Sequence, residues 1–202
     1  MKRTRTSSYV LGLGLTLAFA AIAAGLAPQA STQPQPAPPT TAPAPEAPLE
    51  YVLFTTDKGN FVLELNREKA PITVANLLKY VDDKFYDGTI FHRTTNAGIF
   101  VIQGGGYAAD GSRKATRAPI KNEWQNGLKN DRGTISMART AVADSGTSQF
   151  FINVYPNPAL DQPNDGAAYA VFGKAVTGLK TIDTIHGMPA AGERPTNPVK
   201  VE

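Results

Sequence analysis

The chain has 202 residues, of which 42% are hydrophobic and 18% are charged. This composition is typical of a globular protein with one domain, or two small ones. Cysteine is absent, which excludes disulfides, thiolate catalysis and cysteine-ligated metals. Three cations at the start, Lys2, Arg3 and Arg5, account for the formal charge of +3, so the rest of the chain is neutral. A neutral body without a basic run argues against nucleic acid as a partner.

Residues 1–27 have the pattern of an export segment. The three cations precede an uncharged apolar run over residues 9–27, and Ala21-Ile22-Ala23 offers a cleavage site of the A-x-A type. With cleavage this segment is a signal peptide. Without it, the apolar run is long enough to attach the chain to a membrane as an anchor. Both alternatives predict an extracytoplasmic protein, periplasmic or secreted, or anchored and facing outward.

Residues 28–49 are predicted to be a disordered linker. They hold eight of the 16 prolines of the chain. Proline removes backbone donors and stiffens the chain toward polyproline II. No large apolar residue precedes Leu49, so the segment has nothing to bury. A spacer is the simpler interpretation, and a ligand for proline-binding domains is the alternative.

Residues 50–202 are predicted to form one folded domain. Strands are expected at 51–56 and 59–66 on either side of a hairpin turn. A helix is expected over 71–82, where apolar residues recur at helical spacing behind an N-terminal proline, and another over 178–186. Further short strands are expected at 89–94, 100–105, 133–138, 149–154 and 169–176. This order predicts a mostly β fold, an antiparallel barrel with its ends covered by two helices.

Several predicted strands place a planar polar donor on the same face as a large apolar residue. By side-chain alternation the pairs are Phe91 with Arg93, Val101 with Gln103, and Gln149 with Phe151. A barrel exterior would be polar throughout, so the pattern favours an apolar pocket fringed by donors. Each residue also has a plainer interpretation: a surface ion pair for the arginine, core packing for the phenylalanines, solvent for the glutamines.

Other chemical motifs are weak. The chain has two histidines and no H-E-x-x-H, so no metal site is predicted. The glycine-rich run at 103–111 lacks the Lys-Ser/Thr of a phosphate-binding loop. We interpret its glycines as permitting tight turns and close backbone approach.

In the strands that carry Arg93, Gln103 and Gln149, the chain resembles the cyclophilins, which are peptidyl-prolyl cis-trans isomerases. The resemblance is to their bacterial extracytoplasmic members in particular. Six segments follow the family order: YDGTIFHR (86–93), FVIQGGG (100–106), IKNE (120–123), NGLKNDRGTISMART (126–140), TSQFFINV (147–154) and YAVFGKAVTG (169–178). The resemblance covers nearly all of residues 50–202. It implies an eight-stranded closed antiparallel barrel capped by two α-helices. It also implies an isomerase of proline-containing polypeptides without cofactor or metal, and we expect a monomer.

Carried over residue by residue, the resemblance makes Arg93 the catalytic arginine. Gln103 would hydrogen-bond the substrate backbone beside it, and Gln149 would close the floor of the site. The proline pocket would be formed by Phe100, Val101, Phe151 and Leu160. The groove for the residues before proline would be lined by Ala138, Arg139 and Thr140. Tyr169 stands where many members have histidine, and a structural role is expected for His92.

The chain departs from the family pattern in four places. Two extra residues lie between Arg93 and Gln103, in the turn around 95–98, and could shift Phe100. Val101 replaces a usual methionine. Ala159 stands where cyclosporin-sensitive members have tryptophan, which predicts weak cyclosporin binding. The C-terminal PVKVE makes a short last strand, so barrel closure is expected to be loose.

A cell-envelope interaction protein that acts through the linker of residues 28–49 is one alternative. For the folded domain, two functions compete. One is an isomerase that assists the folding of exported proteins. The other is a non-catalytic cyclophilin-like module or chaperone that binds proline segments and does not require Arg93. The presence of Arg93 together with Phe100, Gln103 and Phe151 favours the enzyme.

Overall fold

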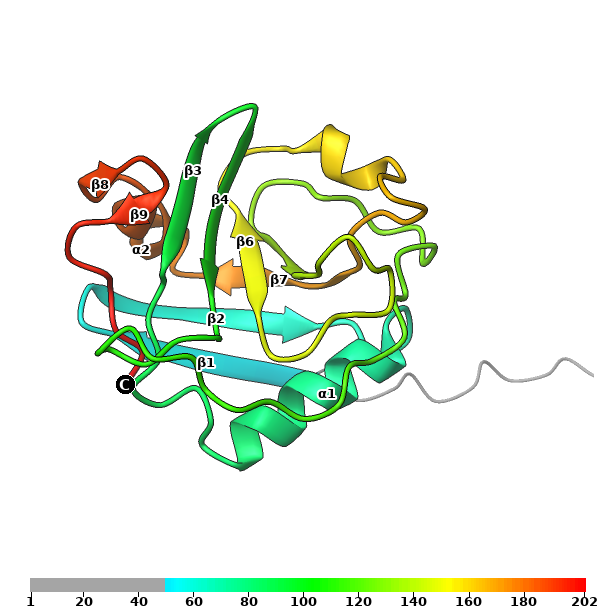
Figure 1. The fold of residues 1–202 in the computed structure, drawn as a ribbon, viewed down its shortest axis with the longest axis horizontal. Coiled ribbons are helices and arrows are strands. Elements are labelled where there is room, and N and C mark those ends of the chain that lie inside the picture. The colour runs from blue at the N-terminus through cyan, green and yellow to red at the C-terminus, as the bar shows by residue number, and fades with distance from the viewer. Residues whose placement is uncertain (1–49) are drawn as a thin grey trace, which may run out of the picture. The chain divides into compact units, whose positions relative to one another are not determined.

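The computed structural model describes residues 50–202, shown in colour in Figure 1. The predicted signal peptide or anchor (1–27) and the predicted linker (28–49) lie outside the described residues. Within 50–202, no helix is both long and apolar enough to cross a membrane.

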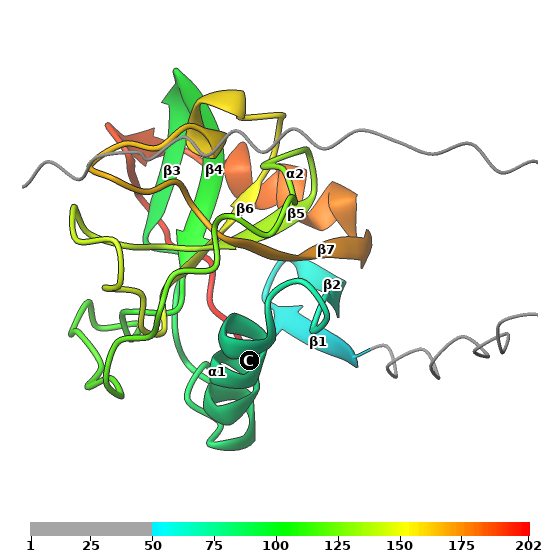
Figure 2. The ribbon, with the colours of Figure 1, turned by 90° about the vertical axis from the view of Figure 1, so that its right-hand side faces the viewer.

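The described chain is organised around one antiparallel sheet with two helices. The sheet has seven strands in the order β1-β2-β7-β5-β6-β4-β3. Its strands are β1 (Glu50–Thr56), β2 (Gly59–Leu65), β3 (Arg93–Ala97), β4 (Ile99–Gly104), β5 (Thr134–Met137), β6 (Phe150–Asn153) and β7 (Val171–Thr177). The helices are α1 (Pro71–Asp82) and α2 (Leu179–His186), which lie well apart in both Figure 1 and Figure 2. The predicted mostly β fold with two helices is therefore confirmed.

Two smaller elements were absent from the sequence prediction. A 3-10 helix, η1, spans Pro158–Asp161. A short hairpin pairs β8 (Ala190–Ala191) with β9 (Arg194–Pro195) near the C-terminus. Strands of two residues carry no periodic signal, so alternation cannot reveal them.

The start of α2 depends on a glycine. Gly178 precedes the helix with a φ of 77°, in the left-handed region that favours glycine. A Cβ there would lie 2.3 Å from the carbonyl oxygen of Asn60 in β2. The chain can therefore turn from β7 into α2 directly against β2 only because this residue has no side chain.

The core lies on the inner face of the sheet and is rich in aromatic rings. Phe61, Phe91 and Phe150 are fully buried. The ring of Phe54 stacks on Phe61 with centroids 5.0 Å apart and meets Phe150 edge-on at 5.4 Å. Ile102 of β4 joins the same cluster. By alternation, the neighbours of Ile102 and Phe150 along β4 and β6 face outward, which leaves that outer face for a site.

The C-terminal segment contacts the end of β1 and the segment that precedes β3. Isolated bridges join Thr56 to Val201 and Ile90 to Lys200. The Val201 amide donates to the Thr89 carbonyl at 2.8 Å, and the Glu202 amide donates to the Thr55 carbonyl at 2.9 Å. These contacts are single bridges and do not form a ladder. The expected eight-stranded closed barrel therefore stays a prediction, beside an observed sheet of seven strands.

One predicted strand begins later than expected. A strand over 89–94 was predicted to put Phe91 and Arg93 on one face, but the regular strand starts only at Arg93. Phe91 packs inside the core, 6.2 Å from the Phe150 ring, whereas Arg93 lies half-exposed beside Gln103. The prediction of a shared face is wrong because side chains alternate only along regular extended backbone, and residues 91–92 lie outside the strand.

Candidate active site

A chain of side-chain hydrogen bonds runs across three neighbouring segments of the sheet. In the β3–β4 ladder Arg93 lies opposite Gln103, and in the β4–β6 ladder Gln103 lies opposite Phe151. Nη1 of Arg93 donates to Oε1 of Gln103 at 3.1 Å. Nε2 of Gln103 donates to Oε1 of Gln149 at 2.9 Å. The predicted arginine and both predicted glutamines are thus brought together.

An apolar wall lies beside these donors. Val101 and Phe151 are 1% and 4% exposed, yet both stand outside the main core cluster. The Phe151 ring meets the Tyr169 ring edge-on, with centroids 5.4 Å apart. The geometry agrees with the predicted pairing of Gln103 with Val101 and of Gln149 with Phe151 on one outer face.

Arg139 contacts the loop that contains Tyr169. Its guanidinium lies 4.8 Å from the Tyr169 ring centroid. It donates to the carbonyl of Asn164 at 2.7 Å and also to that of Ala167. These partners occupy the Arg139 guanidinium on the protein's own backbone, so a positioning role for this side chain is the simplest interpretation.

The two neighbours of Arg139 differ in their surroundings. The Ala138 amide donates to the Gln149 carbonyl at 3.0 Å, which joins the predicted groove to the hydrogen-bonded chain. Thr140 is exposed, and its Oγ1 lies 2.9 Å from the Ser145 hydroxyl. Ala138 therefore borders the site beside Gln149, whereas the contacts of Thr140 are with Ser145.

The two other predicted pocket residues, Leu160 and Phe100, differ in their contacts. Leu160 belongs to η1, and its carbonyl accepts the Tyr169 amide at 3.2 Å. Phe100 alternates with Val101 and so takes the opposite face of β4. Its ring meets Tyr155 with centroids 5.4 Å apart and His186 at 6.5 Å. The structure therefore does not bring the Phe100 ring beside Gln103 and Phe151.

The two extra residues between Arg93 and Gln103 lengthen a regular hairpin. The β3–β4 ladder runs without a register shift from Ala97 opposite Ile99 to Arg93 opposite Gln103. Gly98 makes the turn with a φ of 75°. The insertion therefore extends the tip of the hairpin and leaves the pairing at the site intact.

The glycine run after Gln103 allows close approach, as predicted. Gly105 has a φ of 80°, and a Cβ there would lie 2.8 Å from the Ser148 carbonyl oxygen. At Gly106 a Cβ would lie 2.6 Å from Nε2 of Gln149. Gly106 thus leaves the space that the Gln149 side chain occupies in the site.

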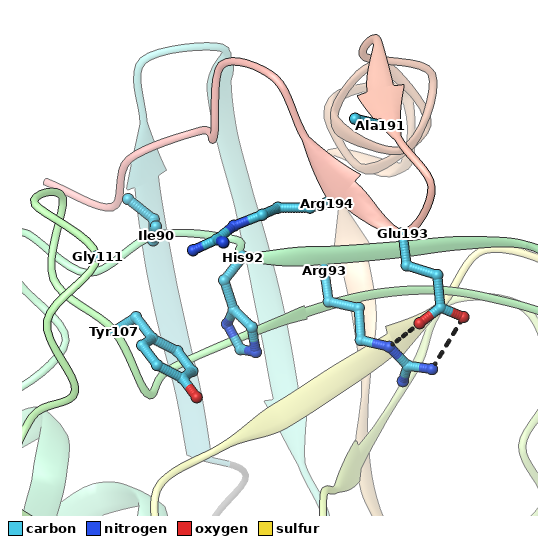
Figure 3. A pocket seen from close by; sticks show the side chains of 8 residues that line it. All are labelled: Ile90, His92, Arg93, Tyr107, Gly111, Ala191, Glu193 and Arg194. Carbon is cyan, nitrogen blue, oxygen red and sulfur yellow. Dashed lines mark hydrogen bonds and ion pairs between the residues drawn. The ribbon is translucent and has the colours of Figure 1, made fainter.

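The sequence did not identify Glu193 as a site residue. Its carboxylate accepts hydrogen bonds from Nε of Arg93 at 2.8 Å and from Nη2 at 3.1 Å (Figure 3). The hydrogen bonds to Arg93 lower the pKa of Glu193. The Thr94 amide also donates to the Glu193 carbonyl at 2.8 Å, which fixes the β8–β9 hairpin to β3. A turn signal at Gly192 could have located the hairpin, but no local pattern connects it with Arg93.

His92 lies on the other side of Arg93. Its ring centroid is 4.6 Å from that of Tyr107. Desolvation by burial is the main cause that lowers the pKa of His92 to about 4. His92 is therefore neutral at physiological pH and supplies no charge to the site.

The arrangement offers fixed hydrogen-bond donors beside an apolar wall. Among residues 50–202, no three His, Asp or Glu side chains gather closely enough to hold a metal ion. A guanidinium donates without titrating, and so it can stabilise a developing lone pair without any acid–base partner.

Comparison with known proteins defines the class of this fold and site. The family model described as "Cyclophilin type peptidyl-prolyl cis-trans isomerase/CLD" matches residues 51–202. The chain therefore belongs to the cyclophilin-type peptidyl-prolyl cis-trans isomerases, a family of enzymes.

Named relatives agree with this assignment. The chain is 53% identical to peptidyl-prolyl cis-trans isomerase A of Dickeya dadantii over 135 residues, which cover 67% of this chain and 70% of the relative. It is 47% identical to peptidyl-prolyl cis-trans isomerase B of Escherichia coli over 140 residues, 68% of this chain and 84% of the relative.

A solved structure supports the fold. A cyclophilin-type isomerase of Cryptosporidium parvum superimposes with a TM-score of 0.63 and 28% identity, covering 76% of this chain and 94% of that one. The same protein was also solved in the presence of the dipeptide Ala-Pro, with a TM-score of 0.62, 28% identity, and coverage of 75% of this chain and 95% of that one.

Proposed function

We propose that this chain isomerises X–Pro bonds in exported polypeptides, with Arg93 as the catalytic residue and the proline ring held against Phe151, Val101 and Leu160. The observation that carries the proposal is the hydrogen-bonded series Arg93–Gln103–Gln149 beside the Phe151 ring. The Cryptosporidium parvum relative was crystallised in the presence of the dipeptide Ala-Pro, which supports proline peptides as the substrate class.

The mechanism follows from the electronic structure of the peptide bond. Resonance makes the C–N bond partly double, so rotation has a barrier of about 18–20 kcal/mol. In the twisted state the nitrogen regains its lone pair and can accept a hydrogen bond. Arg93 supplies a donor that is always protonated. A bond made only in the twisted state lowers the barrier without tightening binding of the planar substrate.

The catalytic proposal is tested with the full chain and its Arg93→Ala variant. Cis-to-trans relaxation of an Ala-Pro-Phe peptide is expected to be strongly accelerated by the wild-type chain. The catalysed relaxation rate should be at least about a hundredfold lower for the variant, the usual effect of removing a hydrogen-bond donor to a transition state. Acceleration that survives the substitution would overturn the mechanism. A folded wild-type chain that binds the peptide without accelerating it would favour the non-catalytic binding module.

The export proposal rests on the basic start and apolar run of residues 1–27. A chain fused at its C-terminus to alkaline phosphatase, which is active only outside the bacterial cytoplasm, should show phosphatase activity. The same fusion without residues 1–27 is the control and should show none. Equal activity of the two fusions would contradict an extracytoplasmic location.

An exported isomerase of this kind would assist folding, because uncatalysed proline isomerisation takes tens of seconds and can limit folding. Refolding of a secreted protein with a slow proline-limited phase should accelerate when the chain is added. If the chain is active on peptides but leaves the rate of that phase unchanged, the folding role is contradicted.

A further inference from the structure

A cavity lies beside Arg93 and belongs to neither the Phe151 wall nor the groove around Ala138. Its volume is about 470 Å³, and its lining includes His92, Tyr107, Glu193 and Arg194 as well as Arg93 itself. Figure 3 shows these side chains around the opening, with Tyr107 beside His92 and with Arg194 above them. A site of this size can take a side chain of a bound polypeptide.

The hairpin β8–β9 forms one side of the cavity and holds two side chains in different directions. In Figure 3 the Glu193 carboxylate points to Arg93, whereas the Arg194 guanidinium extends toward Ile90 and His92. The backbone is fixed at this point, because Ala191 pairs with Arg194 and the Thr94 amide donates to the Glu193 carbonyl. The Arg194 side chain is therefore presented to the cavity by an anchored segment.

The charges around the cavity do not cancel. Arg93 and Glu193 pair with each other. Burial lowers the pKa of His92 to about 4, so its ring is uncharged at pH 7. Among residues 50–202, the guanidinium of Arg194 forms no ion pair with a carboxylate. The cavity thus carries one net positive charge, which suits a carboxylate.

The position of the cavity relative to the hydrogen-bonded series indicates which part of a bound polypeptide would reach it. The series runs from Glu193 to Arg93, Gln103 and Gln149, and from there to the Ala138 amide. The cavity lies at the Glu193 end of this series and the groove for residues before proline at the Ala138 end. A polypeptide whose proline lies at Phe151 would therefore bring the residues after proline to the cavity.

We propose that this cavity is a specificity subsite for an acidic side chain that follows the proline in the substrate, with Arg194 as its cationic partner. The inference rests on the proposed isomerase function and adds a substrate preference to it. Because Arg194 is exposed, the attraction is expected to be modest and to weaken with salt.

The test uses the full chain and Ala-Ala-Pro peptides with Glu, Gln or Lys at each of the two positions after proline. At one of these positions kcat/KM should be about fivefold higher for Glu than for Gln, and lowest for Lys. Arg194→Gln should remove this ratio, and Arg194→Glu should reverse it in favour of Lys. Lys180→Gln, which removes an exposed cation on α2, is the matched control and should keep the wild-type ratio.

A ratio that survives Arg194→Gln, or that is absent from the wild-type chain, would overturn the subsite. Turnover of the Gln peptide reports the isomerase itself. If the wild-type chain does not turn over the Gln peptide, the proposed function is contradicted. If turnover is full but Arg194→Gln has the same Glu/Gln ratio as the wild-type chain, only the subsite is contradicted.

Discussion

Both carboxylate oxygens of Glu193 accept hydrogen bonds from the guanidinium of Arg93, at 2.8 Å from Nε and 3.1 Å from Nη2. The two residues are 100 positions apart in the sequence. Gln103 takes a third N–H of the same group. A guanidinium has five N–H donors, so three fix its plane and, in the proposed mechanism, the other two serve the substrate. Glu193 is therefore a positioning residue for Arg93.

Removing this carboxylate should slow turnover without weakening binding. Both partners are partly exposed, with 37% and 59% of their side chains accessible, so the pair is worth about 1 kcal/mol or less. We expect Glu193→Ala to lower kcat about threefold at unchanged KM. Glu193→Gln, which retains one acceptor oxygen, should have a smaller effect. A rise in KM at constant kcat would contradict a positioning role.

Gln103 connects Arg93 with Gln149, and its loss should affect activity more than stability. Gln103→Leu keeps the side-chain volume but removes the bonds to both partners. At about 1 kcal/mol for each bond, kcat/KM is expected to fall about tenfold or more. Peptide relaxation and urea unfolding, measured on the same sample, separate the two effects. Equal fractional losses of activity and folded population would indicate a structural role only.

Gly106→Ala should act on the site through Gln149. The added Cβ would lie 2.6 Å from Cδ of Gln149, so that side chain must move and lose its bond to Gln103. We expect kcat/KM to fall severalfold. If the effect passes through Gln149, the double variant with Gln149→Ala should be no less active than Gln149→Ala alone. Additive losses in this cycle would show that Gly106 acts by another route.

His92 should make stability depend on pH. Its pKa is lowered from 6.5 to about 4 in the folded chain, chiefly by desolvation. The unfolded chain therefore takes up a proton on this ring between pH 6.5 and 4 that the folded chain does not. The free energy of unfolding should decline across this window as pH falls, and the decline should end below pH 4. Urea unfolding at pH 7 and pH 4.5 measures it, and His92→Gln should show a shallower decline. An identical decline in both proteins would refute the assignment.

Cyclosporin A should bind weakly, because Ala159 offers neither the area nor the N–H of an indole. Ala159 is exposed in η1, so a larger side chain has room there. We expect Ala159→Trp to lower the inhibition constant at least about tenfold. A nanomolar constant for the wild-type chain would contradict this prediction.

Local sequence determined much of this protein. Alternation in β4 and β6 correctly put Val101 with Gln103, and the helical spacing behind Pro71 predicted α1. The family resemblance named Arg93, Gln103 and Gln149 as site residues, and the structure joins them by hydrogen bonds. Strand alternation and helical spacing depend on neighbours along the chain, where backbone sterics and hydrophobic periodicity act.

Only the tertiary structure decided the rest. Alternation failed at Phe91 because the regular strand begins only at Arg93. The resemblance placed Phe100 in the proline pocket, whereas in the folded chain its ring contacts Tyr155. The pairing of Glu193 with Arg93 depends on a two-residue hairpin docking on β3, which no periodic pattern reveals. Charge at a site depends on which distant side chains meet there, and that is a property of the folded chain.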